Sequence, residues 1–303
     1  MRGLNVAVLG SAAGGGVPQW NCRCPVCSLV WAGDSRVEAR TQSSIAVSAD
    51  GERWLLINAS PDLRQQILAT PVLHPRNGAR HSPIEAVALT NADVDHLAGL
   101  LVLRERQPLT VFATGQTHDI LSDNPVFDVL SREVVKRSTM RLNEAIDTGF
   151  GLVIRPFAVP GKVALFMEQG DTVRIGDVTE TTIGLEIAAH GKRLVYIPGC
   201  ASIDASVRKE ARSADLLLYD GTTYTDDEMP KLGLSEKTAH RMGHTPMTGI
   251  GGSLSAFDGL SIGQKAYIHI NNTNPVLIDG SDECQAVQAA GWTITRDGMV
   301  FSL

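Results

Sequence analysis

The sequence predicts an α/β protein of 303 residues, built as a four-layer αββα sandwich in a single domain. Short apolar runs bounded by glycine and other turn residues predict β-strands in both halves of the chain, with helical segments between them. Turn sequences at Asp50-Gly51 and His190-Gly191-Lys192 predict hairpins. Because a strictly parallel, doubly wound sheet needs a helix between every pair of strands, these hairpins favour two sheets packed face to face with helices outside.

The first half of the chain alternates between predicted strands and helices. An apolar run over 5–9, closed by Gly10, predicts a buried strand, and a glycine-rich loop follows it. Ser60 as N-cap and Pro61 at the first helical position predict a helix over 61–68. The other expected elements are strands over 44–48, 54–57, 86–89 and 110–113, a helix over 95–107, and a helical, lid-like region over 118–147.

Predicted strands dominate the second half. The very apolar run Leu216-Leu217-Leu218-Tyr219 predicts a strand, and a helix is expected before it, over 205–211. Further strands are expected over 153–159, 163–167, 181–188, 193–197, 265–270 and 292–300, with a helix over 283–290. Since no linker or internal repeat interrupts this pattern, we expect the whole of 1–303 to form one domain.

Composition and charge exclude several classes of protein. With 43% hydrophobic and 20% charged residues, the chain is typical of a folded protein. Its net charge of −6 argues against binding to nucleic acid. No apolar run reaches the roughly 18 residues that cross a bilayer. The first five residues do not resemble a signal peptide, so we expect a cytoplasmic protein without membrane insertion.

Three of the five cysteines fall within six residues, in a loop over about 20–28. Cys22, Cys24 and Cys27 have the spacing C-x-C-x2-C, and three thiolates this close can converge on one tetrahedral zinc ion. A histidine as fourth ligand would close the site and make it structural. Cys200 and Cys284 stand alone in apolar surroundings and are expected in the core.

A second group of polar residues follows the strand expected over 86–89. Asn91, Asp93 and Asp95 alternate and can share a face as the strand ends, and His96 then lies in the first helical turn. Two carboxylates and an imidazole in this arrangement can hold a metal ion. An equally good interpretation is that Asp95 caps the helix while Asp93 faces water.

This second group resembles the H-x-H-x-D-H turn of the metallo-β-lactamase fold. Asp95, His96 and Gly99 match that turn, whereas Asn91 and Asp93 stand where the fold has its first two histidines. With further matching segments, essentially the whole chain resembles the pyrroloquinoline quinone biosynthesis protein B family. These segments are 8–27, 58–64, 103–109, 196–200, 242–244 and 269–275.

The resemblance implies one metal ion at the active site, because the histidines needed for a second ion are missing. Asp93, Asp95 and His96 would hold this metal, and Asp220 would ligate or orient. So many oxygen ligands with open positions suit Fe²⁺ and O₂ chemistry. His269 matches the fold's last active-site histidine, but we favour it as the fourth ligand of the cysteine-bound Zn²⁺.

Four residues are candidates to contact the substrate. The resemblance implies a ligand with several carboxylates, and Arg64 and Lys162 are candidates to bind them, as is Lys237. His244 is expected in a loop near the mouth of the substrate pocket, since Gly243 and Pro246 interrupt any helix there.

The resemblance implies an enzyme of pyrroloquinoline quinone biosynthesis. The expected reaction is hydroxylation of the tyrosine ring in a cross-linked Glu-Tyr precursor by an iron-dependent, O₂-using site. A non-catalytic carrier that helps to move the quinone or its precursor towards the periplasm is the alternative, and a metal-dependent hydrolase is a weaker one. The expected partners are the quinone or its peptide-derived precursor, and other proteins of the pathway.

Overall fold

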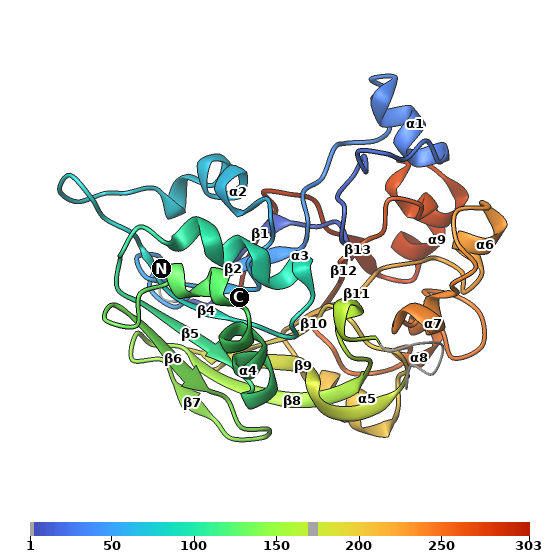
Figure 1. Ribbon diagram of the computed structural model, residues 1–303. Coiled ribbons are helices and arrows are strands. Elements are labelled where there is room, and N and C mark those ends of the chain that lie inside the picture. Colours follow the sequence, from blue (N-terminus) through green and yellow to red (C-terminus); the bar gives the residue numbers. More distant parts are fainter. Residues whose placement is uncertain (1–2, 169–174) are drawn as a thin grey trace.

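The computed structural model of the protein describes residues 3–168 and 175–303. Two seven-stranded sheets pack face to face, and helices cover the outer face of each sheet (Figure 1). The four-layer αββα sandwich predicted from the sequence is therefore confirmed. Among the described residues, no helix is both long enough and apolar enough to cross a membrane.

The first sheet has the strand order β14-β1-β2-β3-β4-β5-β6. Its strands pair antiparallel from β14 to β3 and parallel from β3 to β6. The predicted hairpin at Asp50-Gly51 joins β2 to β3, and the pairing of β14 with β1 places the two ends of the chain in one sheet. The strands are β1 (Asn5–Gly10), β2 (Ser44–Ser48), β3 (Trp54–Ile57), β4 (Ile84–Ala88), β5 (Leu109–Ala113), β6 (Val135–Thr139) and β14 (Val300–Ser302).

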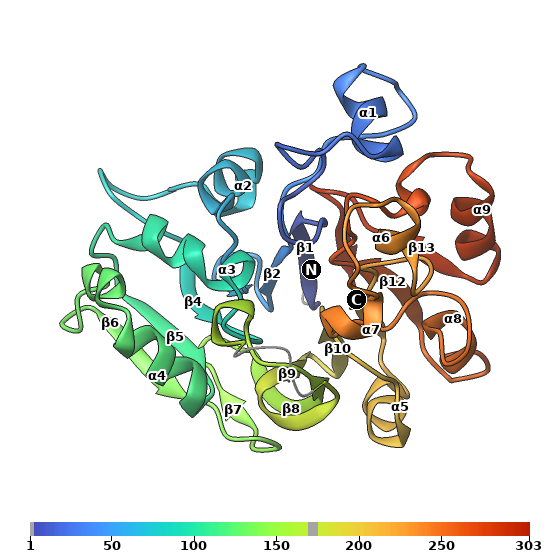
Figure 2. The ribbon, with the colours of Figure 1, turned by 45° about the vertical axis from the view of Figure 1, so that its right-hand side comes forward.

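The second sheet has the strand order β13-β12-β11-β10-β9-β8-β7. Its strands pair antiparallel from β7 to β10 and parallel from β10 to β13. Figure 2 shows β4, β5 and β6 of the first sheet on one side of the molecule and β10, β12 and β13 of the second on the other. The strands are β7 (Ile146–Asp147), β8 (Val153–Gly161), β9 (Asp177–Ala189), β10 (Lys192–Ile197), β11 (Leu216–Asp220), β12 (Gln264–Ile268) and β13 (Trp292–Ile294).

The helices are short. The α-helices are α1 (Pro25–Trp31), α2 (Leu63–Ala69), α3 (Val94–Leu97), α4 (Gly115–Asp123), α5 (Ala205–Ala211), α6 (Glu228–Lys231), α7 (Ala239–Met242), α8 (Ser253–Ala256) and α9 (Asp282–Ala289). The 3₁₀ helices are η1 (Pro71–Leu73), η2 (Ala98–Leu103), η3 (Pro125–Val129), η4 (Leu165–Met167) and η5 (Pro275–Leu277).

Alternation of side chains along β11 explains its continuous apolar sequence. Leu216 and Leu218 belong to the core between the two sheets, whereas Leu217 and Tyr219 belong to the core between the second sheet and its helices. A strand that is buried on both faces has no side chain facing water, so its sequence is apolar at nearly every position. The same alternation lets the inner and outer cores share each strand.

Four predicted elements differ in the structure. The strand expected over 292–300 is divided into β13 of the second sheet and β14 of the first. The helix expected over 95–107 is α3 followed by η2, and at Gly99 of η2 the backbone packs so tightly that a Cβ there would lie 2.1 Å from the Ser60 carbonyl oxygen. The region expected to be helical over 118–147 is helical only in its first part, as α4 and η3; after these the chain forms β6, which pairs in parallel with β5, and then β7. The strand expected over 163–167 is replaced by η4.

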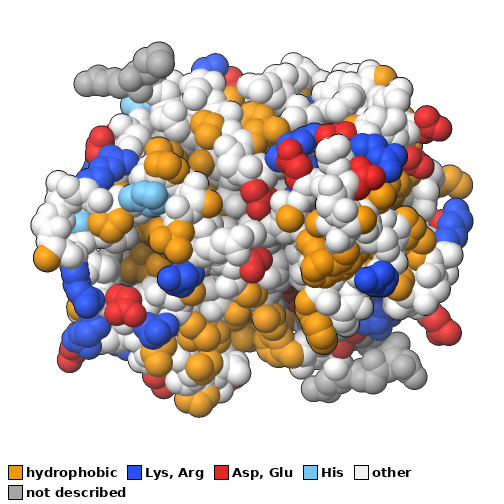
Figure 3. Space-filling view, turned by 90° about the horizontal axis from the view of Figure 1, so that it is seen from above, with side chains coloured by type: hydrophobic (Ala, Val, Ile, Leu, Met, Phe, Trp, Pro, Cys, Tyr) orange, Lys and Arg blue, Asp and Glu red, His pale blue; other side chains and the backbone are white. Residues whose placement is uncertain are grey.

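Charged side chains of both signs are interspersed on the surface. Figure 3 shows acidic and basic residues beside one another on one face of the molecule, with hydrophobic side chains between them. On this face, the mixed pattern differs from the single-signed basic stripe that is typical of nucleic-acid-binding proteins.

Candidate metal centre

Loops from both sheets bring ionisable side chains to one edge of the sandwich. Asp95 and His96 follow β4 of the first sheet, while Asp220 ends β11 and His269 directly follows β12 of the second. The carboxyl ends of parallel strands meet at this edge, where ligands bind in many α/β proteins. A cavity of about 280 Å³ lies here, and its polar lining residues include Asn91, Asp93, Asp95, His96, Lys162, Glu168, Thr222, Lys237, His244 and His269.

Asp95, His96 and His269 form one compact cluster in this cavity. Asp95 Oδ2 lies 3.2 Å from His269 Nε2 and 3.8 Å from His96 Nε2. The two imidazole rings meet edge to face, with their centroids 5.3 Å apart. Ligand atoms bound to one metal ion at about 2.1 Å are about 3.0 to 3.4 Å from one another. The three side chains can therefore share an ion with only small adjustments.

The two ring nitrogens of buried His96 have different surroundings. Nδ1 lies 2.6 Å from Asn91 Oδ1, whereas Nε2 has no hydrogen-bond partner among the described atoms. Asp93 orients the Asn91 amide, because Nδ2 donates to the Asp93 carboxylate and Oδ1 accepts from the Asp93 backbone N–H. The proton therefore lies on His96 Nδ1, and the lone pair of Nε2 faces the cluster. This unpartnered buried acceptor fits a metal ion bound at Nε2.

Thr222 organises the other side of the cavity. Its hydroxyl donates to Asp220 Oδ1 at 2.7 Å, so its contact of 3.0 Å with His269 Nδ1 is one in which the hydroxyl accepts. His269 Nδ1 therefore carries a proton that it donates to Thr222, while its Nε2 points at Asp95. Asp220 Oδ2 lies 2.8 Å from His244 Nδ1 and also accepts the Cys200 backbone N–H. In both rings, therefore, Nδ1 carries a proton.

Two further features of the cluster are the backbone conformation of His269 and the pKa values of its ionisable side chains. His269 has a φ of 58°, a left-handed conformation that costs a non-glycine residue on the order of 1 kcal/mol. Burial works to raise the pKa of Asp95, but His96 and the hydrogen bond with His269 hold that pKa well below its usual range. Burial lowers the pKa of His96. Burial works to lower the pKa of His269, but its hydrogen bond to Asp95 raises that pKa overall, so His269 Nε2–H donates to an ionised carboxylate. A metal ion bound by this cluster would replace that proton.

The other predicted metal ligands lie beside this cluster. Asp93 lines the cavity, and its carboxylate accepts the Asn91 amide. Asp220 is fully buried, and its two oxygens accept four hydrogen bonds, from two groups of Thr222 and from Cys200 and His244. These bonds occupy the acceptor positions of a carboxylate. Asp220, His244 and His269 are nevertheless close enough to form a second possible metal group that shares His269.

The position of His269 corrects the assignment made from the sequence, which joined it to the cysteines. Its Nε2 faces Asp95, and its ring stacks on that of His244 with centroids 5.2 Å apart. The physical reason is that β12 ends at Ile268, which places the next residue at the active edge of the sheet. Sequence analysis placed His244 only near the pocket mouth, since no spacing signal links it to Asp220.

The three basic residues among the predicted substrate contacts have different positions. Lys162 and Lys237 lie in the cavity wall, as expected of residues that contact a ligand. Arg64 is exposed on α2 and is not among the residues that line this cavity, so the structure does not bring it to the site. Helical periodicity turns this residue to solvent, while Leu63 and Gln66 of the same helix are buried.

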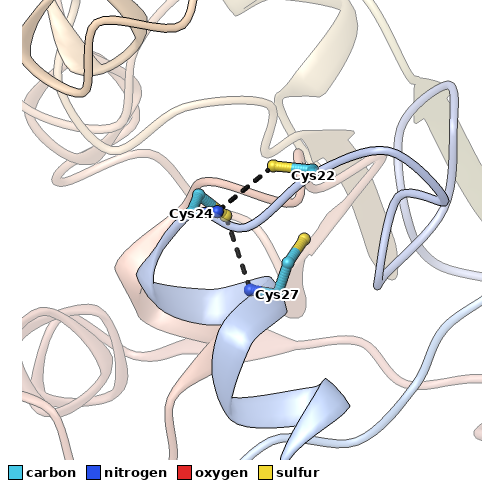
Figure 4. A group of neighbouring side chains, drawn as sticks. All are labelled: Cys22, Cys24 and Cys27. Carbon is cyan, nitrogen blue, oxygen red and sulfur yellow. Dashed lines mark hydrogen bonds between the residues drawn. The ribbon is translucent and has the colours of Figure 1, made fainter.

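The three clustered cysteines lie together, away from the cavity. Figure 4 shows their side chains gathered around the start of α1, where the Cys24 N–H lies 3.4 Å from Cys22 Sγ and the Cys27 N–H lies 3.4 Å from Cys24 Sγ. Burial raises the pKa of the Cys24 thiol to about 12. Zinc binding has to displace this proton, as it does in other thiolate sites.

The side chain that completes this group is Asn272. Its amide nitrogen lies 3.2, 3.7 and 3.3 Å from the sulfurs of Cys22, Cys24 and Cys27. In a tetrahedral zinc site with three sulfurs at 2.3 Å and one oxygen, the oxygen lies about 3.5 Å from each sulfur. A half-turn of the amide places Oδ1 at that position. The residues present therefore fit a closed Zn²⁺ site with an amide oxygen as fourth ligand.

Comparisons with known proteins agree with the fold. Residues 53–270 match a family described as the beta-lactamase superfamily domain. The chain is 56% identical to coenzyme PQQ synthesis protein B of Methylobacterium nodulans, over 99% of this chain and 100% of the relative. The crystal structure of Zn²⁺-bound PqqB from Methylobacterium extorquens has a TM-score of 0.97 and 57% identity, and the match covers 99% of this chain and 100% of that one.

A more distant solved structure shares the fold alone. It is a diphosphatase from the PhnP family, with a TM-score of 0.70 and 22% identity, and the match covers 99% of this chain and 97% of the other.

Proposed function

Because the chain belongs to the coenzyme PQQ synthesis protein B family, within the beta-lactamase superfamily, we propose that it acts in the synthesis of pyrroloquinoline quinone. The proposed reaction is hydroxylation of the tyrosine ring in a cross-linked Glu-Tyr precursor, with Fe²⁺ and O₂. The donor set of Asp95, His96 and His269 carries this proposal. Two imidazoles and one carboxylate with open positions are typical of non-haem Fe²⁺ oxygenases.

The reaction needs a reductant as well as O₂. One oxygen atom enters an aromatic C–H bond as hydroxyl, and the other leaves as water after taking up two electrons and two protons. Bound Fe²⁺ would supply the O₂ chemistry of non-haem iron enzymes. The residues of the chain hold and orient the ion: Asp95, His96 and His269 would be its ligands, while Asn91 and Thr222 fix the orientation of the two rings.

His244 and Asp220 supply a base in the same cavity. His244 Nδ1 donates to the buried Asp220 carboxylate, which leaves Nε2 unprotonated in a ring that lines the cavity. A carboxylate behind an imidazole stabilises the ring after it accepts a proton. His244 would therefore take the proton of the tyrosine hydroxyl, which makes the aromatic ring more electron-rich and easier to oxidise.

Two observations weigh against a two-zinc hydrolase. Asn91 stands where the hydrolases have a histidine ligand, and its amide is bonded to His96 and Asp93. Asp93 takes the place of the other histidine, so the nitrogen ligands of one ion are absent from this turn. The two imidazoles and one carboxylate also suit a single zinc ion with a bound water. An experiment on the function therefore has to compare Fe²⁺ with Zn²⁺.

The cysteine group would serve stability and not turnover. Cys22, Cys24, Cys27 and Asn272 would close all four positions of a tetrahedral Zn²⁺ ion, which leaves none for a substrate. This ion would join the N-terminal loop to the segment after β12. Both segments come from distant parts of the sequence, so the ion would act as a cross-link in the folded state.

A test reconstitutes the full chain anaerobically with Fe²⁺, adds the cross-linked Glu-Tyr substrate and ascorbate, and then admits O₂. We expect O₂ consumption and a product heavier by one oxygen atom. His96→Ala should abolish both, whereas His74→Ala, which removes a histidine outside the cavity, should leave them unchanged. Tight binding of the quinone without turnover under any metal would instead support the carrier. Cleavage of the substrate with Zn²⁺ would support the hydrolase.

A further inference from the structure

One carboxylate at the metal cavity is surrounded by three cations. Glu168 Oε1 lies 3.0 Å from Lys162 Nζ, and Oε2 lies 3.4 Å from Arg241 Nη2 and 3.9 Å from Lys237 Nζ. The Glu168 side chain is only 10% exposed and that of Lys162 only 14%. Glu168 and both lysines line the same cavity as the metal cluster. The charges thus face the space where a substrate would lie.

Positive charge exceeds negative charge in this group. Three cations face one carboxylate, and Arg241 Nη1 is buried without a hydrogen-bond partner among the described atoms. Burial works to raise the pKa of Glu168, but Lys162 and the other two cations hold it below its usual value, so the carboxylate stays ionised. Asp93 and Asp95 also line the cavity, so this surplus of positive charge is local to the end formed by Glu168 and its cations, and that end attracts an anion.

The position of this group relative to the metal cluster is set by one short segment. Arg241 lies in α7, which ends at Gly243 in a left-handed conformation with φ 86°, and His244 follows directly. The stem of Lys162 packs on Gly243, where a Cβ would lie 3.0 Å from Lys162 Cγ. The same turn therefore supports the cations and presents the His244 ring to the cavity.

We propose that Lys162, Lys237 and Arg241 form a subsite for carboxylate groups of the substrate, which Glu168 occupies until the substrate binds. This inference rests on the proposed function, since it takes the metal cavity as the substrate site. The ligand is then a small polycarboxylate, with its carboxylates at the cationic end and its aromatic ring at the end formed by Asp95, His96 and His269. A substrate carboxylate displaces Glu168 and also provides an acceptor for Arg241 Nη1.

The test titrates pyrroloquinoline quinone, as the free acid and as its methyl ester, into the zinc-loaded full chain by calorimetry. We expect the acid to bind more tightly than the ester, and we expect added salt to weaken binding of the acid only. Lys162→Met keeps the packing on Gly243 and should weaken binding of the free acid about tenfold. This is the effect expected from the loss of one charge-assisted hydrogen bond. Glu168→Gln should strengthen binding of the free acid severalfold, because it removes the carboxylate that competes with the substrate.

Lys192→Met is the matched control. Lys192 pairs with one carboxylate, Asp215, and lies outside the cavity, so this change should not alter binding of either form. Circular dichroism checks that each variant is folded. Equal binding of acid and ester overturns the subsite but keeps the cavity as a binding site, whereas no binding of either form overturns the subsite and the proposed function together. If Glu168→Gln binds the acid more weakly, the proposal is also overturned, because Glu168 then stabilises the site and does not compete with the substrate.

Discussion

Asn91→Ala is expected to weaken metal binding at the active site without removing a metal ligand. In the structure Asn91 Oδ1 accepts the Nδ1–H of His96 at 2.6 Å, and His96 is only 2% exposed. The change deletes the only described acceptor of this proton. His96 then loses the bond that selects its tautomer and holds its ring towards Asp95.

The magnitude follows from the hydrogen bond that is lost. A buried donor left without its acceptor costs about 1 to 3 kcal/mol. The lower value applies when water enters the space left by the amide, and the upper value when the space stays dry. Because every 1.4 kcal/mol is a factor of ten, metal affinity should fall by about 5- to 150-fold. Loss of a bond to a metal-bound histidine typically costs 10- to 100-fold in affinity, which agrees with this range.

The assay uses Co²⁺, which reports the two sites separately. Thiolate ligation gives an intense charge-transfer absorption, so this band follows the cysteine site while total bound cobalt follows both. A chelator titration of Asn91→Ala should release the active-site ion first and leave the thiolate band unchanged. Asn124→Ala is the matched control, since among the described residues the exposed Asn124 amide donates only to the Ile120 carbonyl. It should behave like the unchanged protein.

One result would refute this reasoning. If Asn91→Ala keeps full metal affinity while His96→Ala loses it, then His96 binds the ion without help from Asn91. The tautomer argument for the cluster would then fail.

Three further outcomes test the two metal sites and the electrostatics of the core. His269→Ala should remove the active-site ion and keep the cysteine-bound zinc; loss of the cysteine zinc in metal analysis would restore the sequence-based assignment. Asn272→Ala should lower zinc retention and Tm together, and an unchanged Tm with full zinc content would exclude an amide ligand. Burial raises the pKa of Glu228 from 4.5 to about 7, so the folded protein loses up to about 3 kcal/mol of stability as pH rises from 4.5 to 7. Glu228→Gln should flatten this pH dependence in denaturant unfolding, and an unchanged slope would contradict the buried charge.

Local patterns in the sequence were sufficient for the fold. The hairpin signal at Asp50-Gly51 correctly excluded a fully parallel sheet, because a turn of this kind depends only on neighbouring residues. The apolar run at 216–219 marked a strand buried on both faces. Expected elements failed where tertiary contacts outweigh propensity, as at Gly99, where close packing on Ser60 accompanies a 3₁₀ helix in place of a regular one.

The residues of the two candidate sites also fall into those that the sequence placed together and those that it did not. Cys22, Cys24 and Cys27 are close in sequence, so their spacing alone predicted that they gather around one ion. Asp95 and His96 are neighbours on one turn, and the sequence placed them together for the same reason. In each case a short chain segment determines the distance between the ligand atoms.

The remaining residues of both sites come from distant parts of the chain. His269 meets Asp95 across a separation of 174 residues, and Asn272 meets the cysteines across about 250. Spacing in the sequence carries no information on such pairs, because the order of strands in two separate sheets decides which strand ends adjoin. Composition and periodicity therefore determined the layers, the strands and the local ligand groups. The tertiary structure alone decided that His269 lies beside Asp95 and His96 and that Asn272 faces the cysteines, since only packing of the two sheets brings those loops together.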